Sequence, residues 1–375
     1  MSSQERPFLD FYGRHSIIPT ELVIPDEKMF FKQRDFLFQS LGIPPHLLRG
    51  KTIFELGPGN GQKLKHLLSL EPASYTAVDA NPASLEATDR VILASGFRGP
   101  TALVDCDILE HSSDETYDLV LAELVLPTQI DPSLVLQKLR KLVNDGGLLI
   151  LTCMDPVSFL SELIRKLIVI KMEMITADTT DSAKKIAAFF APDLKFLVGM
   201  NRKPTDWALD QIIQPLVGKL FSIPEALDAL NFKMEFHGSS PKFFQDFRWY
   251  KNPVTKDGSS IDLVKSSYWQ SLHLLLDFRL ESKIGDPSLN QMINAICEEI
   301  FLLVNQNKLS DFDKLTISAA TRKLGILFSD VSPITANSIE SFLLFWDSGN
   351  SEELAEFRPW WGRGTQYLSF INDRI

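Results

Sequence analysis

The chain has 375 residues, of which 45% are hydrophobic and 23% are charged, the proportions of a globular protein with a sizeable core. Its net charge of −10 argues against nucleic acid as the main partner, because phosphate binding needs a basic face. The three cysteines lie far apart in apolar contexts, which is typical of reduced core thiols, and no segment is uncharged over the length of a bilayer. We therefore expect a cytoplasmic protein that binds neither nucleic acid nor membrane.

The first 50 residues are rich in proline and aromatic residues, and Pro19 and Pro25 interrupt any continuous helix. Residues 26–41 have the apolar spacing of an amphipathic helix. We expect residues 1–50 to form an N-terminal arm and a helix that together cover a functional site.

A glycine-rich stretch follows, and the rest of the chain is organised around it. Residues 51–56 read as a buried parallel strand, glycine occupies positions 57, 59 and 61, and leucines at helical spacing follow from position 64. A strand, a glycine loop and a helix are typical of a nucleotide-type site. A dinucleotide fingerprint beginning at Gly57 would need its third glycine at position 62, which is Gln62.

Strands and helices then alternate, and acidic residues follow several of the strands. Asp79 ends the second strand, 24 residues after Glu55 (79 − 55), where a carboxylate can hold a ribose diol through two hydrogen bonds. Asp105 and Asp107 follow the third strand, and Glu123 follows the fourth. The predicted strands are 51–56, 74–79, 101–104, 117–122 and 148–152, with helices at 82–94 and 132–142. This alternation predicts a doubly wound parallel sheet.

Beyond residue 153 the pattern becomes mostly helical. Residues 157–221 are predicted to be an insertion of several helices, including 182–190 and 206–220. Strand six is predicted near 230–237, after a helix at 224–230, and strand seven at 243–250. The predicted C-terminal helices are 261–282, 288–305, 311–328 and 336–346. The expected domains are the arm 1–50, a sheet domain 51–254 and a helical region 255–375.

The stretch Glu55-Leu-Gly57-Pro-Gly59-Asn-Gly61 resembles the first motif of the class I S-adenosylmethionine-dependent methyltransferases. Residues 139–151 resemble the helix, turn and strand that follow the fourth motif of that family. The resemblance covers roughly residues 50–153. It implies a Rossmann-like, mostly parallel seven-stranded sheet with S-adenosylmethionine as the cofactor and S-adenosylhomocysteine as the product.

The resemblance also implies a set of site residues. In the family, an acid after strand three binds the adenine amino group and the next apolar side chain packs on the ring, which fits Asp107 and Ile108; Asp105 could share that role. N-terminal helices of the family cover the cofactor or the substrate mouth, so Tyr12, Arg14 and His15 are candidates, unless they only pack the arm. The expected cofactor-binding residues are Glu55, Gly57, Pro58, Gly59, Gly61, Asp79, Ala80, Asp107, Ile108 and Glu123.

Several residues are candidates for binding the methyl acceptor. Glu123 resembles the first glutamate of the arginine N-methyltransferases and could bind an amine and remove its proton, although their second glutamate is replaced here by Pro132. If His15 faces the pocket, it could instead serve as the base for a hydroxyl acceptor, and Tyr12 is a further catalytic candidate. Arg14 or Arg363 could hold an acceptor carboxylate. Trp360 and Trp361 next to Arg363 could reach the pocket, but the favoured interpretation is a tail that anchors the helical region onto the sheet.

These features predict a stand-alone enzyme that methylates a nitrogen of a small, amino-acid-like metabolite in a biosynthetic pathway. An O-methyltransferase of a hydroxylated or carboxylated metabolite is the alternative, and a non-catalytic binding protein with the same fold stays open. A nicotinamide oxidoreductase and an aminopropyltransferase are weaker readings. The six histidines include no pair at ligand spacing, so no metal is expected. A homodimer is left open.

Overall fold

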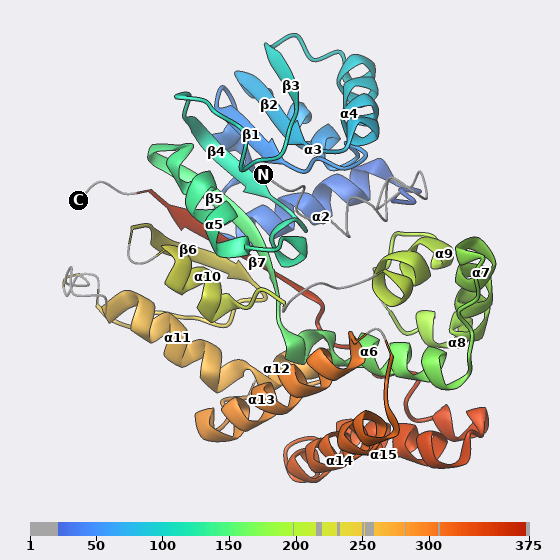
Figure 1. Ribbon diagram of the computed structural model, residues 1–375. Coiled ribbons are helices and arrows are strands. Elements are labelled where there is room, and N and C mark those ends of the chain that lie inside the picture. Colours follow the sequence, from blue (N-terminus) through green and yellow to red (C-terminus); the bar gives the residue numbers. More distant parts are fainter. Residues whose placement is uncertain are drawn as a thin grey trace. The chain divides into compact units, whose positions relative to one another are not determined.

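The computed structural model describes residues 22–372, apart from 198, 215–219, 231–232, 250, 252–258, 282 and 307. The chain divides into two compact units (Figure 1). Unit 1 comprises Met1–Cys153, Leu220–Tyr268 and Thr365–Ile375, and unit 2 comprises Met154–Lys219 and Trp269–Gly364. Unit 1 therefore takes in the last residues of the chain, which the expected boundaries assign to the helical region.

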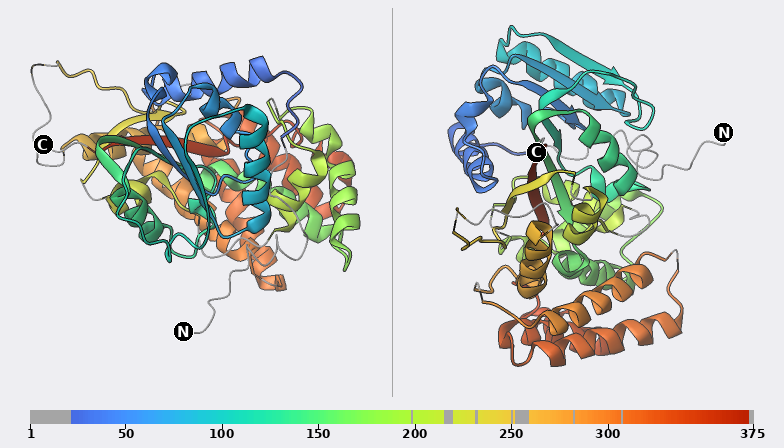
Figure 2. Two further views of the ribbon diagram at one scale, coloured as in Figure 1. Left: turned by 90° about the horizontal axis from the view of Figure 1, so that it is seen from above. Right: turned by 90° about the vertical axis from the view of Figure 1, so that its left-hand side faces the viewer.

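Unit 1 is built on a seven-stranded sheet of order β3-β2-β1-β4-β5-β7-β6. Strands β1 to β5 form parallel pairs, and β6 pairs antiparallel with β7. The apolar run of β1 is buried because helices cover both faces of the sheet (Figure 2). The predicted doubly wound, mostly parallel sheet is confirmed. The strands are β1 (Thr52–Leu56), β2 (Ser74–Asp79), β3 (Thr101–Asp105), β4 (Tyr117–Ala122), β5 (Val143–Met154), β6 (Glu235–Ser240) and β7 (Thr365–Ile371).

The helices of unit 1 begin at residues that favour helix starts. Asp26 accepts hydrogen bonds from the first turn of α2, and Asn81 does the same for α4. Asp131 caps α5, whose first residue is Pro132, so the proline has a local structural role there. The helices of unit 1 are α2 (Glu27–Ser40), η1 (Pro45–Leu48), α3 (Leu64–Ser69), α4 (Pro82–Ser95), η2 (Leu126–Thr128), α5 (Pro132–Lys141), α10 (Ile223–Leu230) and most of α11 (Ser259–Ser271).

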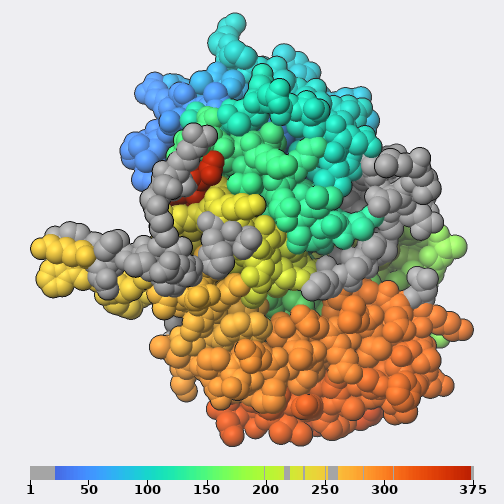
Figure 3. Space-filling view, turned by 60° about the vertical axis from the view of Figure 1, so that its left-hand side comes forward, coloured from blue at the N-terminus to red at the C-terminus, as the bar shows by residue number. Residues whose placement is uncertain are grey.

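The seventh strand is not where the sequence predicts it. Within the predicted strand 243–250, the described residues form no strand, and Phe247 is 91% exposed. Strand β7 instead comes from the end of the chain and lies between β5 and β6 (Figure 3, red beside yellow). Residues 365–371 have the alternation and aromatic content of a strand, but a helical region of about a hundred residues separates them from β6, and local pattern cannot reveal such a pairing.

Unit 2 consists of two segments that together form a helical assembly. Helix α6 is buried on nearly all sides and packs against α12 and α13. Within the predicted helix 206–220, the short α9 continues as one π-helical segment that ends at Ile213, and residues 215–219 lie outside the described residues. None of the helices in the described ranges is long and apolar enough to cross a membrane. The helices of unit 2 are α6 (Pro156–Lys171), α7 (Thr179–Phe189), α8 (Ala191–Leu194), α9 (Pro204–Trp207), η3 (Ala208–Ile213), α12 (His273–Leu276), α13 (Pro287–Val304), α14 (Asp311–Phe328), α15 (Pro333–Ser348) and η4 (Ser351–Leu354).

Candidate functional site

The glycine loop continues directly from β1. The backbone N–H of Gly57 donates to the carbonyl of Val78 at 2.9 Å, which holds the loop against the end of β2. Gly57, Gly59 and Gly61 have φ angles of +69°, +61° and +71°, a region that glycine adopts without a steric penalty. A Cβ at Gly57 would lie 2.6 Å from the side chain of Val125, whereas a Cβ at Gly59 would meet nothing within 4 Å. Gly59 therefore leaves open space at the carboxyl ends of the strands, where a ligand can approach the backbone.

Gln62 has a structural role at the position where a dinucleotide fingerprint would have glycine. Its amide accepts a hydrogen bond from the backbone N–H of Leu22 at 2.5 Å and donates to the carbonyl of Leu22 at 2.9 Å. It also accepts a hydrogen bond from the side chain of Asn60 at 2.8 Å. Gln62 thus joins the start of the described chain to the glycine loop, and this contact requires a side chain.

Asp79 ends β2 beside the glycine loop. Its carboxylate accepts a hydrogen bond from the backbone N–H of Asn81 at 2.9 Å. Burial raises the pKa of Asp79 to about 6, although hydrogen bonds from Asn81, Ser84 and the backbone of Gly59 act in the opposite direction. The hydrogen bond from Gly59 brings this carboxyl group next to the open space of the loop, as a ribose-binding role requires.

The acidic residues after β3 differ in exposure. Asp105 pairs with Asp79 in the register of β3 and β2 and is exposed. Asp107 is half-buried and accepts a hydrogen bond from the backbone N–H of Leu109 at 2.7 Å, and Ile108 is buried. The roles predicted for Asp107 and Ile108 stay predictions. Both residues follow the carboxyl end of β3, and the neighbouring parallel strand β2 ends at Asp79.

Glu123, directly after β4, lies at the centre of a buried charge cluster. The Arg34 guanidinium from α2 donates to both of its carboxylate oxygens, one of them at 3.1 Å. Lys63, at the start of α3, donates to Oε2 at 2.9 Å, and the hydroxyl of Tyr367 from β7 donates to the same oxygen at 3.3 Å. Burial alone would raise the pKa of Glu123, but the attraction of Arg34 and Lys63 outweighs it and holds that pKa well below its usual range. Glu123 is thus an ionised, fully engaged carboxylate, which makes it a poor proton acceptor.

The loop that carries Glu123 is held in an unusual backbone conformation. Leu124 has a φ angle of +63°, which costs a residue with a Cβ on the order of 1 kcal/mol. Its backbone N–H donates to the hydroxyl of Thr152 at 2.7 Å. This turn directs Val125 against Gly57, so the loop after β4 packs on the glycine loop.

Glu55 is a second buried carboxyl group in this part of unit 1. It accepts a hydrogen bond from the hydroxyl of Tyr75 at 2.6 Å. Burial raises the pKa of Glu55 to about 7, and the nearby charge of Glu123 acts in the same direction. Hydrogen bonding by Tyr75 and the positive charges of Lys63 and Arg34 limit the increase. At neutral pH Glu55 is therefore only partly ionised.

This pKa predicts a pH dependence of stability. Because the folded-state pKa of Glu55 is raised above its unfolded value of about 4.5, its contribution is fully present below pH 4.5 and is lost as the pH rises through 7. The loss is on the order of 3 kcal/mol. In the Glu55→Gln variant, which keeps an acceptor for Tyr75, we expect the free energy of unfolding to lack this decrease between pH 5 and 8. Urea unfolding over that pH range measures it, and parallel curves for the two proteins would show that Glu55 does not titrate in this way.

Arg363, another predicted site residue, is not part of this cluster. Tyr12, Arg14 and His15 lie outside the described residues. Arg363 belongs to unit 2, where its guanidinium donates to the carbonyls of Leu274 and Leu280, both at 2.8 Å. Within the described ranges, no group of three or more His, Cys, Asp or Glu side chains is arranged to hold a metal ion.

The tryptophans beside Arg363 are core residues of unit 2. Trp360 and Trp361 are fully buried, and their indole N–H groups donate to the carbonyls of Leu276 and Asp193. The guanidinium of buried Arg165 stacks on Trp361 at 3.5 Å from the ring centre. This Trp-Trp segment therefore stabilises the helical unit.

Sequence reasoning missed Arg34, Lys63 and Tyr367 as members of the site. The sequence did contain one indication for Arg34, because it lies midway between Phe30 and Phe38 at a spacing of four residues, on the face of α2 that is buried. A charged residue within an apolar stripe usually has a buried partner. Lys63 and Tyr367 carried no comparable signal.

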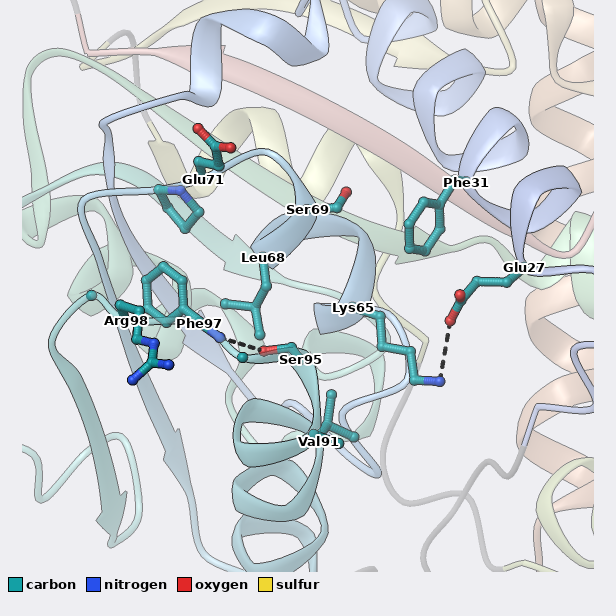
Figure 4. Close-up of a pocket in the computed structure, with 14 residues that line it drawn as sticks. Glu27, Phe31, Lys65, Leu68, Ser69, Glu71, Val91, Ser95, Phe97 and Arg98 are labelled. Atoms are coloured by element: carbon teal, nitrogen blue, oxygen red, sulfur yellow. Dashed lines mark hydrogen bonds and ion pairs between the residues drawn. The ribbon is translucent and has the colours of Figure 1, made fainter.

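Figure 4 shows a different groove, of about 660 Å³, between α2, α3 and the end of α4. Phe31 lies on one side of it, and Lys65 forms an ion pair with Glu27 at 3.3 Å across its edge. Glu71 and Arg98 in its lining shortly precede β2 and β3, so the groove lies at the amino ends of these strands. Ligands of open α/β sheets bind at the carboxyl ends, so this groove is separate from the candidate site.

Comparisons with known proteins identify a domain within unit 1. Residues 54–149 match a protein-family model described as a methyltransferase domain. No curated protein matches the chain.

Several solved methyltransferase structures resemble part of the chain. The N-methyltransferase NodS from Bradyrhizobium japonicum WM9, in complex with S-adenosyl-L-homocysteine, has 16% identity and a TM-score of 0.32 over 40% of this chain and 74% of its own. The StiE O-methyltransferase fragment 961–1257 has 18% identity and a TM-score of 0.29 over 33% of this chain and 43% of its own. Similarity at this level says nothing about the acceptor.

The residues present suit an adenosyl sulfonium cofactor. Gly59 leaves space where a side chain would otherwise lie, and Asp79 supplies a carboxyl group beside it. The family match includes the strand tips that carry these residues. The chain therefore carries a class I S-adenosylmethionine-dependent methyltransferase domain, with S-adenosylmethionine as its cofactor.

Proposed function

We propose that the protein transfers a methyl group to a nitrogen of a small, amino-acid-like metabolite. The bound cofactor supplies an electrophilic methyl group, so the protein needs to orient the acceptor and to keep its nitrogen unprotonated. No covalent protein intermediate is required. The net charge of −10 supports a small molecule over a nucleic acid.

The charge cluster around Glu123 is the observation that carries this proposal. It combines two cations, Arg34 and Lys63, with one ionised carboxylate, while Glu55 beside it is only partly ionised at neutral pH. The balance leaves positive charge near the carboxyl ends of β1 and β4, and such charge favours a carboxylate. In this proposal Glu123 orients Arg34 and Lys63, and Lys63, which is partly exposed, contacts the acceptor carboxylate. Proton removal then belongs to another group, and His15 and Tyr12 remain the candidates.

A direct test supplies the full chain with S-adenosylmethionine and a panel of amino acids, amines without a carboxylate, and hydroxylated acids. We expect S-adenosylhomocysteine to form with a carboxylated amine, and mass spectrometry of the product to locate the methyl group on nitrogen. In Lys63→Met we expect a higher KM for that acceptor and an unchanged KM for its analogue without the carboxylate. Equal effects on both substrates would remove Lys63 from carboxylate recognition.

The same positive cluster would also hold the carboxylate of a hydroxylated acid, so an O-methyltransferase is the second candidate. The mass spectrum of the product separates the two, because the methyl group would then lie on oxygen. If S-adenosylhomocysteine binds but no acceptor of the panel is methylated, a non-catalytic binding role becomes the leading explanation.

Asp79 gives a prediction about the cofactor alone. We propose that its carboxylate hydrogen-bonds the ribose, so Asp79→Ala should weaken S-adenosylhomocysteine binding by about 1–3 kcal/mol, roughly 5- to 150-fold. Asp89→Ala, an exposed change on α4, is the control and should leave the affinity unchanged. Isothermal titration calorimetry measures both variants, and equal affinities would exclude Asp79 from the site.

A further inference from the structure

Helix α14 of unit 2 is apolar on two opposite sides. One side packs against α13 and α15 within the unit (Figure 1). Its buried residues are Ile317, Ala320, Thr321, Leu324 and Phe328. The other side carries three large apolar side chains that are more than two-thirds exposed: Phe312 at 76%, Leu315 at 71% and Ile326 at 69%.

The exposed apolar residues form a stripe that one charged residue interrupts. Phe312, Leu315, Ala319 and Ile326 are separated by three, four and seven residues, which is the spacing of a coiled-coil seam, and exposed Arg322 occupies the seam position between Ala319 and Ile326. They extend along about four turns of the helix. Ala319 lies at the midpoint, where its small side chain permits the close approach of another helix. Single exposed apolar residues are ordinary on a protein surface, but a stripe at this spacing marks an interaction surface.

The charges of α14 indicate which partner fits this stripe. The first half of the helix carries Asp311 and Asp313 with one lysine, Lys314, which pairs with Asp311 at 2.9 Å. The second half has no acid and carries Lys323 and Arg322, and Arg322 also forms an exposed ion pair with Asp347 of α15 at 3.7 Å. A parallel pair of these helices would bring like charges together, whereas an antiparallel pair places the acidic end of one helix beside the basic end of the other. The helix is therefore complementary to itself in the antiparallel direction.

We propose that the exposed face of α14, defined by Phe312, Leu315, Ala319 and Ile326, binds the same face of a second copy of the chain, antiparallel and with a two-fold axis near Ala319. Such an interface is isologous, so each contact occurs twice and the assembly closes as a dimer. Phe312 of one copy then packs near Ile326 of the partner subunit. The two copies of Ala319 meet at the axis.

Sedimentation equilibrium of the full chain tests the surface. We expect twice the mass of one chain for the unmodified protein and a single mass for Leu315→Lys, which places a positive charge beside Arg322 and Lys323 of the partner subunit; its exposed position should leave the fold intact by circular dichroism. The control is Leu93→Lys on α4 of unit 1, because Leu93 is equally exposed at 73%. It should remain dimeric. A monomeric unmodified protein would overturn the proposal, as would a dimer that Leu315→Lys does not dissociate.

Cysteine cross-linking tests the direction of the helices. Ala319→Cys should form a disulfide between two copies under mild oxidation. Phe312→Cys alone should not, because in the antiparallel pair its two copies lie about 21 Å apart (14 residues at 1.5 Å). A mixture of Phe312→Cys and Ile326→Cys should cross-link. A self-linked Phe312→Cys dimer would indicate parallel helices and would overturn the proposed arrangement.

Discussion

Replacing Phe370 with alanine is expected to destabilise unit 1 by about 3–5 kcal/mol, the cost of removing a buried aromatic side chain. Phe370 lies in β7, is almost fully buried and contacts Phe236 of β6 edge-on, with the ring centres 5.9 Å apart. Since β7 lies between β5 and β6, a cavity at Phe370 weakens the sheet on both sides. Thermal or urea unfolding of the full chain measures the effect.

Phe247→Ala is the matched control. Phe247 lies in the segment that sequence alone assigns to strand seven, yet it is 91% exposed, so its truncation should change the free energy of unfolding by less than about 0.5 kcal/mol. The reverse order of the two effects would mean that residues 243–250 form the strand and that the C-terminal residues do not.

The second large effect is expected at Arg34. Arg34→Met keeps an apolar side chain of similar length. Buried Glu123 then loses its bidentate hydrogen bonds from the guanidinium and keeps only those from Lys63 and Tyr367. Breaking a buried ion pair from one side destabilises a protein by about 3–5 kcal/mol, and the remaining partners favour the lower value. Equilibrium unfolding at pH 7 measures it.

Arg49→Met provides the comparison, because Arg49 forms an ion pair with Glu71 in which both side chains are exposed. Exposed pairs contribute at most about 1 kcal/mol. The double variant Arg34→Met/Glu123→Gln should be less destabilised than the sum of the two single variants, since no buried charge is then left without its partner. If the losses in unfolding free energy of Arg34→Met and Glu123→Gln were additive in the double variant, the buried cluster would be contradicted. Equal losses in Arg34→Met and Arg49→Met would contradict it as well.

The sequence predicts those parts of the site that depend on neighbouring residues. Strand ends and turns within 30 residues of one another predict the positions of Glu55, the three glycines and Asp79. The structure brings Gly59 and Asp79 into contact. Glu123 was predicted to lie at the end of β4, and β4 ends at Ala122. These positions are fixed by local strand boundaries, and a single sequence contains that information.

The partners of Glu123 could not be found in this way. Arg34 is 89 residues from Glu123, and Tyr367 is 244 residues away. Tyr367 reaches Glu123 only because β7 returns to the sheet after the helices of unit 2. The interpretation of Glu123 as a free base followed from its position alone, and the cluster that neutralises it depends on pairing between distant segments.

We propose that the strand tips of unit 1 bind the adenosyl sulfonium cofactor between the glycine loop and a set of carboxyl groups. Titration calorimetry of the full chain with S-adenosylhomocysteine tests it most directly, with NADH as the competing ligand. We expect saturable binding of one S-adenosylhomocysteine per chain, weakened in Asp79→Ala, and no binding of NADH. Absence of S-adenosylhomocysteine binding by a folded protein, or saturable NADH binding in its place, would contradict the claim.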